Sequence, residues 1–407
     1  MRRLKHCGTA IVAVAITLAT AAAGRADELA DRLRPHVGAT LDLVELGTGK
    51  RFVRPTLENL VERQGRLTQL RLRPEGEKAV ISLPVTGIVK IVAGRETVHE
   101  AEAKGKGVAQ VKGKRAKEAY EKQVADSAAR MRERGVSPWP TLSAEEHAAE
   151  VEALRTFVAS VKEAFPNLQT TETHEFIVAT DIPAGQMAPY VASLDAMHDF
   201  LCDLYGIPRG EPVWKGKCLV VAFLAEQDFQ AFEARFMKTQ MQGAHGLCHQ
   251  SSDGRVIMAC HRGDDAPAFA HMLVHETSHG FNHRWMSPER LPNWLNEGIA
   301  EWVGTKVVPG SNQVPLKEAH ALEFMRRTGS LGPDFLTRQN IDAVQYGMAS
   351  SLVKFLARDL KKFAAFVQGI KEGVPVEESL QASYKVSLAD LIGAYGVAVG
   401  VPQLQAK

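Results

Sequence analysis

The chain has 407 residues, which is too long for one ordinary hydrophobic core, so two or three domains are expected. Its 45% hydrophobic and 24% charged residues are typical of a soluble globular protein. The net charge of +2 gives no argument for an anionic membrane or for nucleic acid, and we expect no nucleic-acid partner.

The first residues have the pattern of an export signal. MRRLKH is a basic start, IVAVAITLATAAA is an apolar run of signal-peptide length, and GRA offers small residues for cleavage after Ala26. Cleavage after Ala23 is one alternative, and an uncleaved anchor is another, although the apolar run is short for a membrane span. We therefore expect a signal peptide at 1–26, a periplasmic or extracellular protein, and no stable membrane anchor after cleavage.

Residues 27–102 are expected to form a small β-rich module. TLDLVEL, LTQLRLRP, KAVISLP and GIVKIVAG alternate or run apolar, and Gly- and Pro-rich turns separate them. These strands are enough for a small barrel or sandwich, and they carry no catalytic constellation.

Residues 103–168 are expected to be a basic linker followed by helices. The run KGKGVAQVKGKRAK contains no acidic residue, which is typical of a solvated linker, with a patch for an anionic polymer as the alternative. Ser143, followed three residues later by Glu146, predicts a capping box at the start of a helix.

Residues 169–407 are expected to form one α+β domain. EFIVATDI and KCLVVAFLA are typical of buried strands, and a helical pattern follows each of them. Strands that precede a run of helices favour an α+β fold. After a hairpin near Gly254, the periodicity predicts helices over 266–285, 292–303, 317–328, 345–361, 376–383 and 387–397.

Cysteine usage is compatible with export. One cysteine leaves with the signal, and the four that remain permit two disulfides in an oxidising compartment. Ser-Asp-Gly between Cys248 and Cys260 is a hairpin signal that would place these two cysteines opposite each other. The sequence therefore permits Cys248–Cys260 and Cys202–Cys218 disulfides, and four free, buried cysteines are an equal alternative.

The stretch HMLVHETSHGFNH places four histidines four residues apart, from His271 to His283. Each such step climbs about 6 Å along a helix, so four ligands on one ion are impossible and only a neighbouring pair can chelate. His275 and His279 enclose Glu276 in an HExxH motif. The two imidazoles can bind zinc on one helix face, and the glutamate can reach a zinc-bound water as general base.

A third ligand is required, because a catalytic zinc has three protein ligands and one open position. The following segment, LPNWLNEGIAEW, places Glu297 eighteen residues after His279, and Glu301 follows one turn later. HETSH followed by WLNEGIAE resembles the gluzincin metallopeptidases, which are peptidase MA-like zinc enzymes, and in particular their poorly characterised exported bacterial members.

This resemblance implies a thermolysin-like catalytic domain with one Zn²⁺. It implies His275, His279 and Glu297 as the zinc ligands and Glu276 as the general base. It also implies that Glu301 hydrogen-bonds a ligand histidine.

Two further features follow from the resemblance. Tyr346 in QYGMASSLVKFLA fits the gluzincin tyrosine that donates to the tetrahedral intermediate, with a packed tyrosine at a helix start as the alternative. GRVIMACH fits the edge strand that pairs with substrate backbone. The G-x-M-E-N segment of aminopeptidase relatives is missing, which argues against grip on a free N-terminus.

The sequence therefore predicts an exported zinc metallopeptidase acting on peptides or proteins. The alternative is a non-catalytic envelope binding or assembly protein that retains the gluzincin scaffold.

Overall fold

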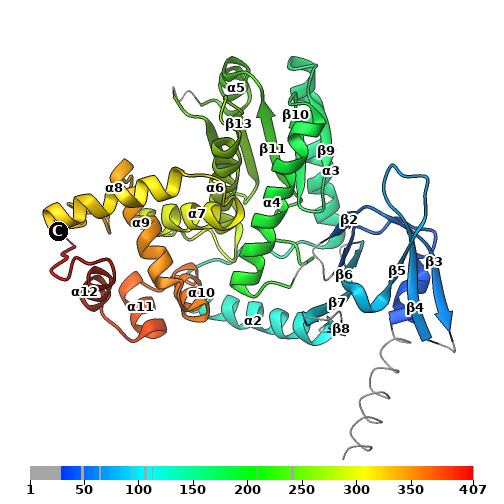
Figure 1. The fold of residues 1–407 in the computed structure, drawn as a ribbon, viewed down its shortest axis with the longest axis horizontal. Coiled ribbons are helices and arrows are strands. Elements are labelled where there is room, and N and C mark those ends of the chain that lie inside the picture. Colours follow the sequence, from blue (N-terminus) through cyan, green and yellow to red (C-terminus); the bar gives the residue numbers. More distant parts are fainter. Residues whose placement is uncertain are drawn as a thin grey trace, which may run out of the picture. The chain divides into compact units, whose positions relative to one another are not determined.

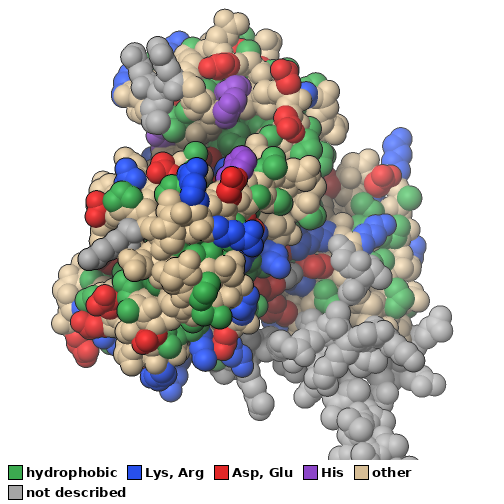
Figure 2. All heavy atoms as spheres, turned by 60° about the vertical axis from the view of Figure 1, so that its left-hand side comes forward, with side chains coloured by type: hydrophobic (Ala, Val, Ile, Leu, Met, Phe, Trp, Pro, Cys, Tyr) green, Lys and Arg blue, Asp and Glu red, His purple; other side chains and the backbone are tan. Residues whose placement is uncertain are grey.

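The computed structural model describes most of the chain after the predicted signal peptide, which lies outside the described residues. These residues are 29–46, 50–63, 66–94, 96–104, 108–111, 113–208, 210–239 and 243–406. Within this part, no helix combines the length and the apolar character that a membrane span requires. On the face drawn in Figure 2, charged side chains of both signs are interspersed, in keeping with the small net charge.

The chain divides into two compact units (Figure 1). The first ends at Ala119 and also takes in the short segment Pro208–Glu211. The second comprises Tyr120–Ile207 and Pro212–Lys407 and contains all the predicted site residues.

The first unit is β-rich, as predicted. Its elements are η1 (Arg34–His36), β1 (Leu43–Leu46), β2 (Arg51–Val53), β3 (Thr56–Arg63), β4 (Arg66–Arg73), β5 (Ile81–Pro84), η2 (Val85–Gly87), β6 (Ile88–Ala93), β7 (Glu96–Lys104) and β8 (Val108–Val111). The sheet orders are β2-β1-β6-β7-β8 and β3-β4-β5. Alternating side chains such as Leu70, Leu72 and Ile91 form its core. The sequence did not predict β3, because two register shifts interrupt its alternation.

Two helices come next, and the first of them begins inside the predicted basic run, which also contains β8. They are α2 (Gly113–Glu133) and α3 (Ala144–Ala164). Most side chains of the run lie outside the described residues. At the start of α3 the predicted capping box is confirmed: the Ser143 hydroxyl accepts from the Glu146 N–H, and the Glu146 carboxylate accepts from the Ser143 N–H.

The second unit contains a five-stranded sheet with helices on both faces. Its elements are β9 (Gln169–Glu172), β10 (Phe176–Thr180), α4 (Ala184–Tyr205), β11 (Cys218–Phe223), α5 (Glu226–Phe232), the π-helical turn η3 (Glu233–Met237), β12 (Gly246–Gln250) and β13 (Val256–His261). The sheet order is β12-β13-β11-β10-β9, in which the three central strands are parallel. β11 is apolar throughout and β10 is apolar apart from Thr180, because both faces of these strands are buried.

The rest of the unit is helical, which confirms the α+β class. The helices are α6 (Ala266–Arg284), α7 (Asn293–Val307), α8 (Gln313–Thr328), α9 (Ala343–Leu356), α10 (Leu360–Lys371), α11 (Val376–Tyr384) and α12 (Leu388–Ala398). The predicted helix 345–361 is wrong at its end. The chain leaves α9 after Leu356, and the Asp359 side chain accepts from the Lys362 N–H to begin α10, which the sequence did not predict.

Both predicted disulfides are wrong. In the hairpin, Cys248 lies opposite Met258 and Cys260 lies opposite Gly246, so the two cysteines are two positions out of register. The second expected pair is divided between α4 and β11. The cysteines that the structure describes are all free: Cys202, Cys218, Cys248 and Cys260.

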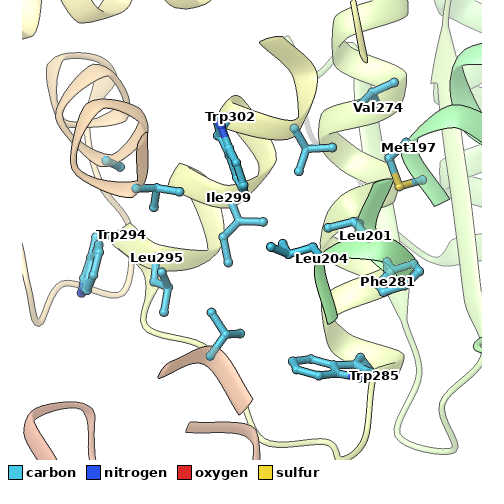
Figure 3. Close-up of a cluster of buried hydrophobic side chains, with 14 of the residues drawn as sticks. Met197, Leu201, Leu204, Val274, Phe281, Trp285, Trp294, Leu295, Ile299 and Trp302 are labelled. Carbon is cyan, nitrogen blue, oxygen red and sulfur yellow. The ribbon is translucent and has the colours of Figure 1, made fainter. Parts of the chain in front are cut away.

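A buried apolar cluster joins α4, α6 and α7 (Figure 3). Leu201 and Leu204 of α4, Phe281 of α6, and Ile299 and Trp302 of α7 belong to it. Burial of each such side chain contributes about 1.5–3 kcal/mol, so the cluster fixes α6 and α7 relative to each other.

Two glycines let the motif-bearing helices approach their neighbours closely. A Cβ on Gly280 would lie 2.5 Å from Val256 Cγ1 of β13. A Cβ on Gly298 would lie 2.5 Å from the backbone oxygen of Ala349 in α9. Gly280 directly follows His279, and Gly298 directly follows Glu297. Close packing against β13 and α9 therefore favours glycine at both positions.

Gly298→Ala is expected to lower the free energy of unfolding by about 1–3 kcal/mol, because the added methyl meets backbone that cannot move aside. Gly393→Ala in α12 is the control, because its Cβ would have nothing within 4 Å. That variant should gain about 0.5–1 kcal/mol from helix propensity. Urea unfolding measures both, and equal effects of the two substitutions would contradict the packing argument.

Candidate metal centre

Helix α6 carries the HExxH residues on the side that packs against α7. The helix begins at Asp265, whose side chain accepts from the Ala268 N–H. His275 and His279 lie one turn apart, and Glu297 lies in the second turn of α7. The two helices thus supply all three predicted ligands.

The structure brings the three ligand atoms into a nearly equilateral triangle. His275 Nε2 is 3.2 Å from His279 Nε2 and 3.2 Å from Glu297 Oε2. His279 Nε2 is 3.3 Å from the same oxygen. An ion with tetrahedral bonds of about 2.0–2.1 Å needs ligand atoms about 3.3 Å apart. The triangle has this size, so the group could hold a metal ion.

The ligands are nearly buried but retain an opening. His275 is 8% exposed, and His279 and Glu297 are each 9% exposed. Burial opposes the charge on Glu297, but His279 and His275 outweigh it and hold the pKa of this carboxyl well below its usual range. Burial also disfavours charge on His279, yet the carboxylates of Glu297 and Glu276 raise its pKa to about 9. A metal ion must therefore displace a proton from His279, because only neutral imidazole is a ligand.

A second group, His271, His275 and Glu301, could also hold a metal ion. Glu301 Oε2 is 3.2 Å from His271 Nε2, and its Oε1 is 3.7 Å from His275 Nδ1. Lys317 Nζ from α8 lies 2.5 Å from this Oε1. Because an ammonium already occupies the carboxylate, the first group is the better metal site. Glu301 instead faces Nδ1 of His275, which is the ring nitrogen that points away from the first group.

Glu301 is the most deeply buried carboxylate of the cluster, with 0% exposure. Burial opposes its charge, but the hydrogen bond to His271 and the charges of His275 and Lys317 lower its pKa to about 2. The sequence predicted that Glu301 hydrogen-bonds a ligand histidine. Its hydrogen bond is to His271 rather than to His275.

Glu276 and Tyr346 both lie close to the ligands. Glu276 is half-buried, and its charge acts on both His279 and Tyr346. Tyr346, in the first turn of α9, has its ring centroid 6.3 Å from that of His275. Burial and the neighbouring carboxylates, Glu297 first among them, raise the pKa of Tyr346. Its hydroxyl therefore stays protonated at neutral pH and can donate a hydrogen bond.

A cleft of ≈ 810 Å³ opens beside His279. Its walls include residues 248–250 of β12, Asn282 and His283 at the end of α6, and the loops at 336–339 and 373–376. The two loops have no motif or spacing signal, and the sequence did not identify them. The predicted edge strand GRVIMACH is wrong, because β13 lies between β11 and β12 and leaves β12 at the edge.

A buried lysine holds the connection between α6 and α7. Lys371, at the end of α10, donates from Nζ to the backbone oxygens of Ser287 at 2.6 Å and of Glu289 at 2.7 Å. The Ser287 hydroxyl donates back to the Lys371 carbonyl at 2.5 Å. Burial lowers the pKa of Lys371 to about 7. The connection is thus fixed by α10, and it forms one wall of the cleft.

The remaining histidines are not gathered at the metal ligands. His283 lies 5.3 Å from the Trp139 ring at the cleft wall. His249 also lines the cleft, and its Nε2 is 2.9 Å from the buried carboxylate of Glu233. His245 and His261 lie against each other, with ring centroids 4.9 Å apart.

A comparison with models of known protein families and with curated proteins finds no match to this chain. The donor set itself is informative. Two imidazole nitrogens and one carboxylate oxygen, supplied by two helices, suit a borderline divalent ion, and three protein ligands leave one tetrahedral position for water or substrate.

The raised pKa of His279 predicts a pH-dependent contribution to the stability of the metal-free protein. Protonated His279 is favoured in the folded state, so its contribution is complete below pH 6.5 and is lost as the pH rises through about 9. The free energy of unfolding should therefore exceed that of His279→Gln most at pH 6.5, and the difference should shrink toward pH 9.

Denaturant unfolding of both metal-free proteins measures this difference. Other titrating groups such as Lys371 are present in both proteins, so their contributions to the free energy of unfolding cancel in the difference. Saturating metal should remove the His279 contribution to the pH dependence of the wild type, because the ion replaces the proton. A difference that stays constant or grows with pH would contradict the raised pKa of His279 in the folded, metal-free protein.

Proposed function

We propose that the protein is a zinc-dependent metallopeptidase of the gluzincin type, with a thermolysin-like catalytic domain. The observation that carries the proposal is the triangle of His275, His279 and Glu297, with Glu276 beside it. Three nitrogen and oxygen ligands with one open position are the pattern of catalytic rather than structural zinc. A site that served only structure would have no use for a further carboxylate beside its ligands.

The side chains around the ligands fit the steps of peptide hydrolysis. Zinc held there would lower the pKa of a bound water and polarise a peptide carbonyl. Glu276 accepts the proton of the attacking water and passes it to the leaving amine. The Tyr346 hydroxyl donates to the oxyanion that forms when the carbonyl is attacked.

The cleft supports a peptide as substrate. β12 ends the sheet order and contributes residues 248–250 to the wall beside His279. The outer side of an edge strand presents backbone N–H and C=O groups that can pair with an extended chain. Such pairing places little demand on the substrate sequence. The signal-like N-terminus supports an exported enzyme, acting in the periplasm or outside the cell.

Glu276→Ala is expected to bind zinc in the same stoichiometry as the wild type and to lose about 10²–10⁴-fold in kcat/KM, because the general base is gone. Metal analysis and cleavage of a mixed-peptide library measure the two properties. Glu323→Gln on the exposed face of α8 is the control and should retain full activity.

Equal cleavage by Glu276→Ala would overturn the mechanism. A wild-type protein that binds zinc but cleaves nothing in the library would instead favour a non-catalytic envelope protein built on the same scaffold.

Tyr346→Phe is expected to lower kcat by about 10²–10³-fold, with little change in KM or in zinc content, because the hydroxyl acts only on the developing oxyanion. Steady-state kinetics on a cleaved library peptide measures this. An unchanged kcat would show that Tyr346 is only a packed residue at the start of α9.

A further inference from the structure

We infer that Lys317 is a positioning residue of the metal centre, which anchors Glu301 behind the ligand His275 and supports the ring of Tyr346. No spacing or motif marks this lysine. The inference rests on the proposed function for its catalytic consequence, while its effect on metal binding stands on the geometry alone.

Lys317 contacts two groups of the centre from a third helix. Its Nζ lies 2.5 Å from Glu301 Oε1 of α7 and 5.3 Å from the centre of the Tyr346 ring of α9. An ammonium over a tyrosine ring is attracted to its π face. One side chain of α8 therefore touches the partner of a ligand histidine and the proposed oxyanion donor.

The backbone of Lys317 is held in place by α9. A Cβ on Gly347 would lie only 2.1 Å from the Lys317 carbonyl oxygen, so the two helices meet at this point without an intervening side chain. Gly347 directly follows Tyr346 in the chain. The position of Lys317 is thus fixed relative to Tyr346, and its side chain runs inward from a partly exposed position to a fully buried carboxylate.

Glu301 needs this cation. A fully buried carboxylate is unfavourable unless it is paired and hydrogen-bonded. Glu276 and Glu297 already place two negative charges at the site, and the two positive charges of a zinc ion would balance only those two. Lys317 supplies the third positive charge on Oε1, while His271 binds Oε2 at 3.2 Å.

With both oxygens engaged, the Glu301 carboxylate is held in one orientation. Its Oε1 faces His275 Nδ1 at 3.7 Å, while His275 Nε2 points to the ligand triangle. A carboxylate behind a ligand imidazole fixes the ring orientation and favours the tautomer that binds metal through the other nitrogen. Lys317 therefore acts on the metal through Glu301 and His275.

The test compares full-chain Lys317→Met and Lys317→Arg with a matched control. Lys354 has the same type of ion pair, with Nζ 2.6 Å from Glu318 Oε1 and a side chain of similar exposure, but Glu318 is not one of the groups at the metal centre. Zinc affinity is measured by competition with a chromogenic chelator, and kcat and KM on a cleaved library peptide. Thermal unfolding checks that each variant is folded.

Lys317→Met should bind zinc about 10–100-fold more weakly and turn over more slowly at unchanged KM, in line with the loss of an outer partner of a metal ligand. Lys317→Arg should restore much of both, because the cation is kept. Lys354→Met should match the wild type. Wild-type zinc affinity in Lys317→Met, equal losses in Lys317→Met and Lys354→Met, or no rescue by arginine would each overturn the inference.

A double variant keeps the test decisive if Lys317→Met does not fold. Lys317→Met/Glu301→Gln leaves no unpaired buried charge, and its zinc affinity should equal that of Glu301→Gln alone. A further loss in the double variant would show that Lys317 acts by another route. If the wild type binds no zinc and cleaves no peptide, the proposed function fails. If the wild type does both and the Lys317 variants are unaffected, only this inference fails.

Discussion

The packing of α6 against α7 is the constraint on which the rest of the second unit depends. His275 and His279 come from one helix and Glu297 from the other, and their ligand atoms meet at 3.2–3.3 Å only while the helices keep their distance. Apolar side chains such as Phe281 and Ile299 fill the space between these helices and α4. On the outer sides, glycines allow α6 to lie on the sheet and α7 to lie on α9. The metal ligands are therefore placed by the core and not by flexible loops.

Charge balance is the second constraint. Carboxylates and histidines share one nearly buried region, and each group affects the pKa of its neighbours. In the metal-free protein the proton on His279 offsets the charge of Glu297. A divalent ion would take over that task, while Lys317 balances Glu301 in either state. Binding of the ion is thus coupled to release of a proton. With or without the ion, Glu297 and Glu301 each have a positively charged partner, so the folded protein contains neither carboxylate as an unpaired buried charge.

The sequence predicted what depends on local spacing. The capping box at Ser143, the helix that carries the four histidines and the α+β class follow from patterns within one or two turns or strands. It failed where the outcome depends on register or on distant packing. Hairpin register separates Cys248 from Cys260, and the pairing of β13 with β11 leaves β12 at the sheet edge; neither follows from composition. Lys317 joins the cluster only because α8 packs on α9, a contact with no local signal.

Whether His275, His279 and Glu297 together hold one zinc ion is tested most directly by X-ray absorption at the zinc edge of the purified protein. The arrangement predicts one zinc per chain with nitrogen and oxygen ligands at about 2.0–2.1 Å and the outer-shell scattering of two imidazoles. Because Cys248 also lines the cleft beside His279, sulfur is the informative alternative. A zinc–sulfur distance of about 2.3 Å, or a purified protein that takes up no zinc, would contradict the proposed centre.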